Sequence, residues 1–299
     1  MASSPQNHRV RGNLRFHKLP LLLVTSPDTG KTMKIFCGIL AVACAAISLR
    51  ATAAEPDHTP DLTTPAGAID PVCEIERQRR HRFPATRMER QLKGWRVLIS
   101  QRLLDDHAAA TEQALELLAA QLEEIVRVVP ADAVAKLRKV PLYLSPAYDG
   151  FGAKAEYHPA AGWLREHGRD PAMEKAVEFT NILIFAEETR RMPNFTLHEL
   201  AHAYHDRELA EGFSNPDVIA AFERARAGGI YDRVERQDTK GTRTTDRAYA
   251  LTNQQEYFAE TTEAYFSRND FFPFCREELE SHDPHACRML QQAWGCGEQ

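Results

Sequence analysis

The sequence lacks several features that would place the protein in a special class. Its formal net charge is only -5 over 299 residues, so charge indicates neither a nucleic-acid partner nor a membrane-surface partner. It has no internal repeat, no C-x-x-C pair that would favour a cysteine zinc site, and no apolar run long enough to cross a membrane comfortably. What remains is an ordinary globular composition, with 43% hydrophobic and 26% charged residues, and we expect one or two domains.

The N-terminal region has the parts of an export signal. One lysine and an apolar run are followed by the small residues Ala51-Thr52-Ala53-Ala54. We therefore expect residues 1–54 to comprise an upstream segment and a signal peptide at about 33–54, with the true start at Met33. The protein would be exported and would keep no stable membrane span once the signal is removed. A lipoprotein anchor at Cys44 is an open alternative.

Four cysteines follow the signal: Cys73, Cys275, Cys287 and Cys296. An even number of cysteines in an exported protein predicts two disulfides. The last three lie close together in the sequence, so one bond should staple the C-terminal tail. The other could join Cys73 to that tail, and the sequence leaves all three connectivities open.

Apolar periodicity divides the rest of the chain into segments. Residues 55–85 are expected to form a flexible leader, and the basic stretch at 77–90 a solvated surface. Residues 150–170, with several glycines, are expected to form a structured loop. The patterns predict strands at 94–100, 140–145 and 176–186, and helices at 106–129, at 131–139, from an N-cap at Asn194, and at 253–266.

The stretch "TLHELAHAYHD" (196–206) contains the spacing H-E-x-x-H. Residues four apart lie above one another on an α-helix, so His198 and His202 can direct their imidazoles at one zinc ion, about 2 Å from each. Glu199 is turned by about 100° from His198. It can therefore act as the general base on a water beside the ion without becoming a ligand. A surface helix that carries the motif by chance is the alternative.

A zinc site needs a third protein ligand, and Glu256 is the best candidate. His205 lies about 10 Å along the helix from the first histidine of the motif, too far to share the ion. Glu223 lies where another class of zinc peptidase has its ligand, but the surrounding sequence lacks the pattern of that class. Glu256 belongs to the apolar helix "QEYFAETTEAYF". On the same face Glu260 could accept a hydrogen bond from a ligand histidine, and Glu263 continues that face.

The pair of segments "LHELAHAYHD" and "AYALTNQQEYFAE" resembles the zinc peptidase domain of anthrax lethal factor and related Pro-Pro endopeptidases, which are gluzincins. The resemblance covers about residues 177–268. Ala201 stands where these relatives usually have glycine, and the linker between the second histidine and the third ligand is longer than usual. The resemblance implies zinc binding by His198, His202 and Glu256, a general base at Glu199, a supporting carboxylate at Glu260, and polarisation of the substrate carbonyl by Tyr249, seven residues before the third ligand.

The resemblance also implies a zincin-like fold. With the predicted elements, we expect a mostly helical α+β catalytic domain at 151–299 and an extension of helices and strands at 86–150 packed on it. The strand expected at 177–186 would be the sheet edge that pairs with an extended protein or peptide substrate. An ordinary core strand is the equal alternative. The expected activity is that of an exported metallopeptidase with one Zn2+ per chain. A catalytically idle zincin module that binds a partner, and a zinc hydrolase of a non-peptide cell-wall amide, are alternatives.

Overall fold

The computed structural model describes residues 86–238 and 240–297. A mixed five-stranded sheet lies at the centre of the N-terminal half of this part of the chain. β2, β3 and β5 are parallel to one another, while β1 and β4 pair antiparallel with their neighbours and form the two edges. In their order across the sheet, the strands are β1 (Arg87–Leu92), β2 (Trp95–Ser100), β3 (Leu142–Leu144), β5 (Ala176–Phe179) and β4 (Ala155–His158). The described chain is an α+β protein, as predicted.

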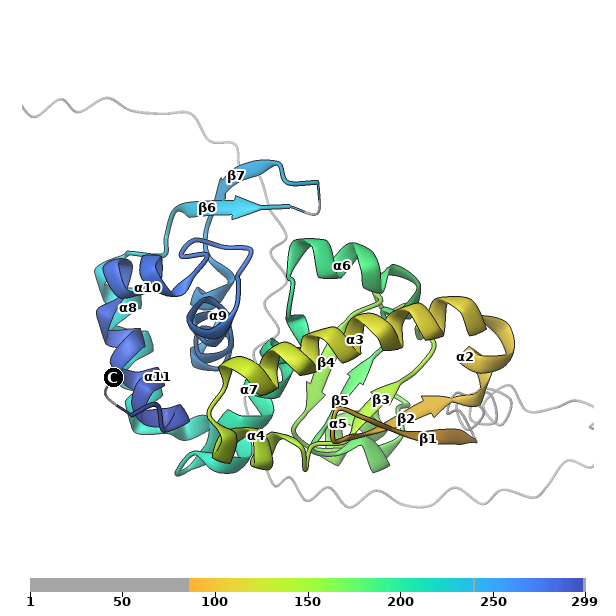
Figure 1. Cartoon of the computed structure of the whole chain (residues 1–299). Helices are drawn as coiled ribbons and strands as arrows, with labels where there is room; N and C mark the ends of the chain where they lie inside the picture. Colours follow the sequence, from red (N-terminus) through yellow and green to blue (C-terminus); the bar gives the residue numbers. More distant parts are fainter. Residues whose placement is uncertain (1–85, 239, 298–299) are drawn as a thin grey trace, which may run out of the picture. The chain divides into compact units, whose positions relative to one another are not determined.

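The described chain has ten α-helices, some on the two faces of this sheet and others packed on one another away from it. They are α2 (Gln101–Asp106), α3 (Ala108–Val128), α4 (Ala131–Leu137), α5 (Ala161–Glu166), α6 (Phe185–Arg191), α7 (Phe195–Glu208), α8 (Pro216–Gly228), α9 (Gln254–Phe266), α10 (Arg276–His282) and α11 (Pro284–Trp294). Successive side chains of a strand point to opposite faces. Val97 and Ile99 therefore join the main core, which includes α3, whereas Leu98 packs in a small cluster with Leu164 of α5. Figure 1 shows α3 lying across the sheet.

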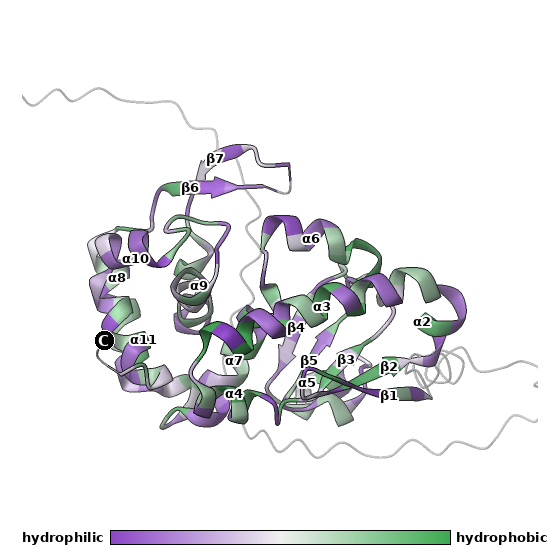
Figure 2. Cartoon of the chain, viewed as in Figure 1, coloured by the Kyte–Doolittle hydropathy of each residue, from purple (hydrophilic) through white to green (hydrophobic). Residues whose placement is uncertain are grey.

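The long helix expected at 106–129 is confirmed as α3, and its predicted apolar positions form the buried face. Leu118, Leu122 and Ile125 are fully buried in the main core. Val126 was expected on that face, but its side chain is 41% exposed because it lies at the border of the stripe. The alternation of apolar and polar residues along α3 is visible in Figure 2. The strands expected at 94–100 and 140–145 and the short helix at 131–139 are likewise confirmed, as β2, β3 and α4.

The strand expected at 176–186 is too long, and of the two alternatives for it, a sheet edge and a core strand, the core strand is confirmed. It ends at Phe179, and the apolar run continues as a 3-10 turn, η2 (Ile182–Ile184), and as α6. β5 is also not an edge, because it pairs with β3 on one side and with β4 on the other. Hydrophobicity alone does not separate a buried strand from a short helix. The edge on this side of the sheet is β4.

β4 lies inside residues 150–170, which were expected to contain only a loop. Because glycines and prolines are typical of loops, neither β4 nor α5 was predicted in this stretch. A four-residue strand such as "AEYH" has little intrinsic preference, so its pairing with β5 and its packing decide its conformation. β1 was likewise not predicted, since its side chains are mostly exposed and polar, as is common for an edge strand.

The C-terminal half of the described chain is built around α9. This helix packs against α7 on one side and against α8, α10 and α11 on the others. A hairpin formed by β6 (Val234–Gln237) and β7 (Arg243–Asp246) precedes it, in a polar region where no element was predicted. η4 (Tyr249–Leu251) leads from the hairpin into α9. The helix expected at 253–266 is thus confirmed and lies beside the helix that carries the histidine motif.

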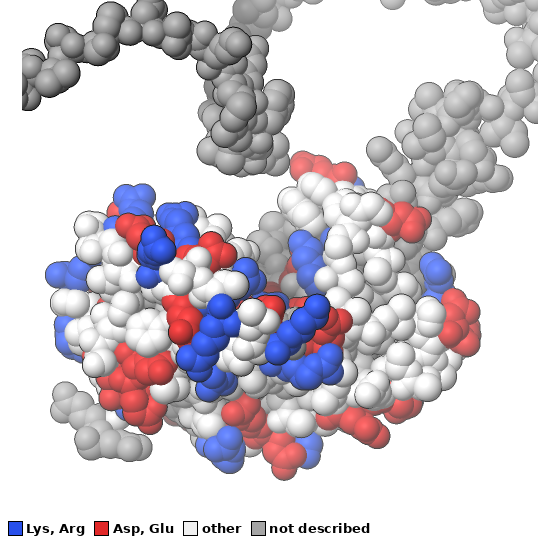
Figure 3. All heavy atoms as spheres, turned by 90° about the horizontal axis from the view of Figure 1, so that it is seen from above, with Lys and Arg blue, Asp and Glu red and all other residues white. Residues whose placement is uncertain are grey.

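The boundary expected at residue 150 does not separate two cores. β2 and β3 lie before it and β4 and β5 after it, yet all four belong to one sheet. The expected signal peptide at about 33–54, Cys44, the leader at 55–85 and Cys73 lie outside the described residues. No helix within the described ranges is both long and apolar enough to span a bilayer. Acidic and basic side chains are interspersed on the face seen in Figure 3.

Within the described residues, the C-terminal tail is held by packing, and its cysteines form no disulfide with one another. Cys275, Cys287 and Cys296 are free cysteines, so the staple expected among them is not formed in the described part of the chain. Instead, the indole of Trp294 on α11 stacks on Tyr204 of α7, with ring centroids 4.1 Å apart. The hydroxyl of Tyr204 donates to the carbonyl oxygen of Ala293 at 3.1 Å.

Candidate metal centre

The start of α7 is fixed by side chains that reach it from α3. Asn194 is the N-cap, as predicted, and its Oδ1 accepts from the backbone N–H of Leu197 at 3.1 Å. Its Nδ2 donates to the carbonyl oxygen of Gln121 at 3.0 Å. The Gln121 side chain in turn accepts from the backbone N–H of Thr196. These bonds set where α7 begins and how it is rotated, and therefore which residues it turns towards α9.

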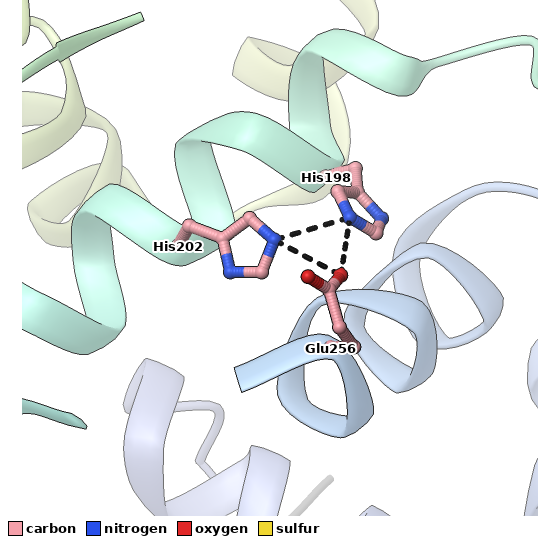
Figure 4. A group of neighbouring side chains, drawn as sticks. All are labelled: His198, His202 and Glu256. Atoms are coloured by element: carbon pink, nitrogen blue, oxygen red, sulfur yellow. Dashed lines mark hydrogen bonds and ion pairs between the residues drawn. The ribbon is translucent and has the colours of Figure 1, made fainter. Parts of the chain in front are cut away.

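His198 and His202 of α7 meet Glu256 of α9, as Figure 4 shows. The N-cap Asn253 accepts hydrogen bonds from the backbone N–H groups of Gln255 and Glu256, so the first turn of α9 is held in place. The three functional atoms are His198 Nε2, His202 Nε2 and Glu256 Oε2. They lie 3.1 Å (His198 to His202), 3.2 Å (His198 to Glu256) and 3.3 Å (His202 to Glu256) apart.

This triangle has the size that a zinc ion requires. Ligands held tetrahedrally at about 2.0–2.1 Å from zinc are about 3.3 Å from one another. Two imidazole nitrogens and one carboxylate oxygen are also donors that zinc prefers. No fourth protein ligand joins this group among the described residues. Three protein ligands with one open position are typical of catalytic rather than structural zinc sites.

The electrostatics of the group also favour a cation. Burial by itself lowers the pKa of His198, but the hydrogen bond to Glu256 and the nearby carboxylate of Glu263 outweigh burial and raise the pKa well above its usual value. Burial raises the pKa of Glu256, and the bonds from His198 and His202 reverse this and lower it below the usual range. Both shifts mean that positive charge between the imidazoles and the carboxylates is stabilised, which is what a divalent metal would supply.

Two buried carboxylates lie behind His198. Its Nδ1 is 3.3 Å from Oε1 of Glu263 and 3.6 Å from Oε1 of Glu260. Glu260 was the residue expected to support a ligand histidine, but its Oε2 is engaged by Asn269 Nδ2 at 3.1 Å. Glu263 is therefore the closer support. Burial raises the pKa of both carboxylates.

Glu199 is anchored by the edge of the sheet. Its Oε2 accepts a hydrogen bond from the backbone N–H of Tyr157 on β4 at 2.8 Å. The Tyr157 hydroxyl donates to Asp206, two turns further along α7, at 2.7 Å. One residue of β4 thus holds the strand against α7 at two points. The sequence offered no signal for this contact, because residues 150–170 were not expected to contain a strand.

A cavity of about 530 Å³ opens over the three converging residues. Glu199 and Tyr249 both line it, so the structure brings the two expected catalytic residues to the same cavity as the ligand set. Tyr249 lies on η4 and is 47% exposed. Burial of its hydroxyl and the nearby charge of Glu256 raise the pKa of Tyr249 to about 12, so this hydroxyl stays protonated near neutral pH. The other walls come from β4, the segment 181–195, β6 and residues 270–271.

His205 and Glu223, which were considered and rejected as the third ligand, both lie outside the group of His198, His202 and Glu256. His205 is fully buried and neither ring nitrogen has a hydrogen-bond partner in the described part of the chain. Its ring packs between Phe213 and Phe258. Glu223 lies on α8 with a side chain that is 47% exposed and paired with Arg226.

No protein-family model, curated protein or solved structure matches the chain. The resemblance to the lethal-factor-type gluzincins therefore rests on the motif residues.

We expect His198→Ala and Glu256→Ala to lose zinc, because each removes one of three ligands and leaves the remaining buried groups unpaired. Bound metal should fall from about one ion per chain to nearly none after dialysis in metal-free buffer, measured by elemental analysis. Glu223→Ala is the matched control and should keep the ion. Retention of zinc by Glu256→Ala at the parental affinity would show that the ligand assignment is wrong.

We expect His205→Phe to weaken the dependence of the free energy of unfolding on pH between about pH 6.5 and pH 4. Burial, followed by the nearby His202, lowers the pKa of His205 to about 4, whereas the unfolded chain takes up this proton below about pH 6.5. Between these values the unfolded state binds more protons, so stability is lost as the pH falls, by about 2–3 kcal/mol at pH 4.

The free energy of unfolding, measured with denaturant from pH 7.5 to pH 4, should fall less steeply in the variant than in the parent. His107→Phe changes an exposed histidine and serves as the control. Equal slopes for the parent and His205→Phe would contradict the proposed burial of a neutral imidazole.

Proposed function

We propose that the protein is a zinc metallopeptidase of the gluzincin type, with a zincin-like fold. The observation that carries this proposal is the convergence of His198, His202 and Glu256 within 3.3 Å of one another at a cavity that Glu199 and Tyr249 also line. Export rests on the sequence pattern at about 33–54. Three ligands, a carboxylate base and a hydroxyl donor around one cavity are the set that hydrolysis of an amide requires.

Zinc, when bound, would act as a Lewis acid and lower the pKa of water in the cavity to about 7. Glu199 would take the proton of the attacking water and pass it to the leaving nitrogen. Because Oε2 of Glu199 is held by the Tyr157 N–H, the other carboxylate oxygen is free for this transfer. The protonated hydroxyl of Tyr249 would donate a hydrogen bond to the substrate carbonyl oxygen as negative charge develops there.

β4 offers a way to hold an extended peptide. In an antiparallel pair only every second residue bonds to the neighbouring strand. Lys154 and its partner Thr180 are such a bonded pair, so Ala155 and Tyr157 direct their backbone groups away from β5. The N–H of Tyr157 is already bonded to Glu199, so the backbone groups of Ala155 and the carbonyl oxygen of Tyr157 are the ones left for a peptide. Addition of a peptide strand at this edge would give affinity through main-chain bonds. The substrate-pairing role predicted for 177–186 is thus assigned to β4.

We expect Glu199→Gln to abolish cleavage while zinc content and fold are kept. Loss of a general base typically lowers the rate by about 10²–10⁴-fold. The measurement is cleavage of a diverse peptide pool, read by mass spectrometry, together with zinc content and melting temperature. Glu208→Gln, on the same helix but away from the cavity, is the control and should cleave normally.

Equal cleavage by Glu199→Gln and the parent would refute the mechanism. No cleavage of any peptide by the zinc-loaded parent would favour the idle binding module. Cleavage of cell-wall fragments but not of peptides would favour the amidase.

We expect Tyr249→Phe to lower kcat by about 10²–10³-fold with little change in KM, because the hydroxyl would bond to charge that develops only in the transition state. The side chain is 47% exposed, so the melting temperature should stay close to that of the parent. Steady-state kinetics on one peptide chosen from the pool give both constants. An unchanged kcat would remove Tyr249 from the mechanism.

A further inference from the structure

Tyr157 joins β4 to α7 through both its backbone and its side chain. Its backbone N–H donates to Glu199 Oε2 at 2.8 Å, and its hydroxyl donates to Asp206 Oδ2 at 2.7 Å. Burial and the bond to Asp206 raise the pKa of Tyr157, so the hydroxyl stays protonated and acts as the donor. Glu199 and Asp206 are seven residues apart, which places them about two turns from each other on nearly the same face of α7. One residue of the sheet edge thus bonds to two carboxylates of the helix.

Asp206 also contacts Lys175, the residue before β5. Nζ of Lys175 lies 2.5 Å from Oδ2 of Asp206, the same oxygen that accepts from Tyr157. The backbone of Lys175 has a φ of 59°, a left-handed conformation that residues other than glycine rarely adopt. Its N–H donates to the carbonyl oxygen of His158, the last residue of β4, at 2.7 Å. A strained residue persists where its surroundings enforce it, so the position of Asp206 is fixed from α7, from β4 and from the residue before β5.

The strand pairing explains why the Tyr157 N–H is free to reach α7. Tyr157 is opposite Val177 of β5, at a position whose backbone groups point away from β5. Its N–H therefore takes Glu199 as its acceptor. A glutamate side chain has several rotatable bonds, and fixing one carboxylate oxygen removes much of this freedom. Glu199 lines the cavity, where a general base must be held within hydrogen-bond reach of the attacking water.

We propose that Asp206 is a positioning residue for Glu199 and acts on it through Tyr157. This rests on the proposed peptidase function, in which Glu199 is the general base. Asp206 does not line the cavity, so it would affect catalysis only by fixing the position of β4 along α7. Without its bond to the Tyr157 hydroxyl, β4 would still pair with β5, but the N–H bond to Glu199 would weaken. A displacement of about 1 Å at a catalytic group can cost about 100-fold in rate.

Amide hydrogen exchange, followed by NMR in the zinc-loaded protein, measures the bond to Glu199 directly. The Tyr157 N–H is protected by Glu199, whereas the N–H of Glu156 bonds within the sheet and reports the pairing of β4. Glu199→Ala removes the acceptor and gives the exchange rate of the released N–H. Tyr157→Phe and Asp206→Ala should raise the exchange rate at position 157 about tenfold and leave the rate at position 156 unchanged.

Steady-state kinetics test the consequence for catalysis. Tyr157→Phe should lower kcat about tenfold with KM little changed, because a displaced base slows the chemical step without weakening ground-state binding. Asp206→Asn keeps an acceptor oxygen for the hydroxyl and should restore most of the rate lost in Asp206→Ala.

Tyr204→Phe is the matched control. It also loses a buried hydroxyl bond on α7, to the carbonyl oxygen of Ala293, but Tyr204 does not line the cavity and the variant should keep its kcat. Tyr157→Phe and Tyr204→Phe should both lower the melting temperature by about 2–6 °C. Loss of stability therefore does not account for a difference in kcat between them.

The two measurements separate this proposal from the peptidase proposal. Faster exchange at position 157 alone supports the coupling of Asp206 to Glu199 even if the zinc-loaded parent cleaves no peptide. Unchanged exchange at position 157 in both Tyr157→Phe and Asp206→Ala overturns it. Equal acceleration at positions 156 and 157 also overturns it, because β4 would then merely detach from the sheet. With an active parent, an unchanged kcat in Tyr157→Phe, or an equal loss of kcat in Tyr204→Phe, overturns the positioning role.

Discussion

Packing of α7 against α9 is the constraint on which the rest of the structure depends. Two imidazoles from one helix and one carboxylate from the other approach within 3.3 Å, and this requires both helices to be fixed in rotation and in height. Side-chain caps provide that: the buried Asn194 starts α7, and the partly buried Asn253 starts α9. α3, α11 and the sheet then enclose the pair. A shift of about 1 Å at any of these supports would separate the ligand atoms beyond what one ion can bridge.

The same contact brings like charges together in the interior. Glu260 and Glu263 are almost fully buried behind His198, and burial opposes their ionisation. A cation between His198 and Glu256 would offset this cost, so metal binding and stability of the helix pair are linked. His205 is another fully buried residue, and its ring nitrogens have no hydrogen-bond partner in the described part of the chain.

Local patterns predicted four of the ten α-helices of the described chain, α3, α4, α7 and α9, and long-range pairing decided most of the strands. α3 and α9 were predictable because their apolar residues recur with the helical period. β4 was missed and β5 was extended too far, because a four-residue strand is stabilised by its neighbours rather than by its own composition. The cysteine pattern predicted a staple that the described chain does not form, since spacing in the sequence does not place two sulfur atoms within bonding distance.

The amino-acid sequence by itself determined the candidate ligands, because the four-residue spacing of His198 and His202 is a local property of one helix. It also singled out Glu256 and Tyr249, which the structure brings to the same cavity. Only the tertiary structure decided that β4 is the edge and that Glu263 is the carboxylate closer to His198. Each of these depends on segments far apart in the chain, whose relative positions follow from packing of the whole core.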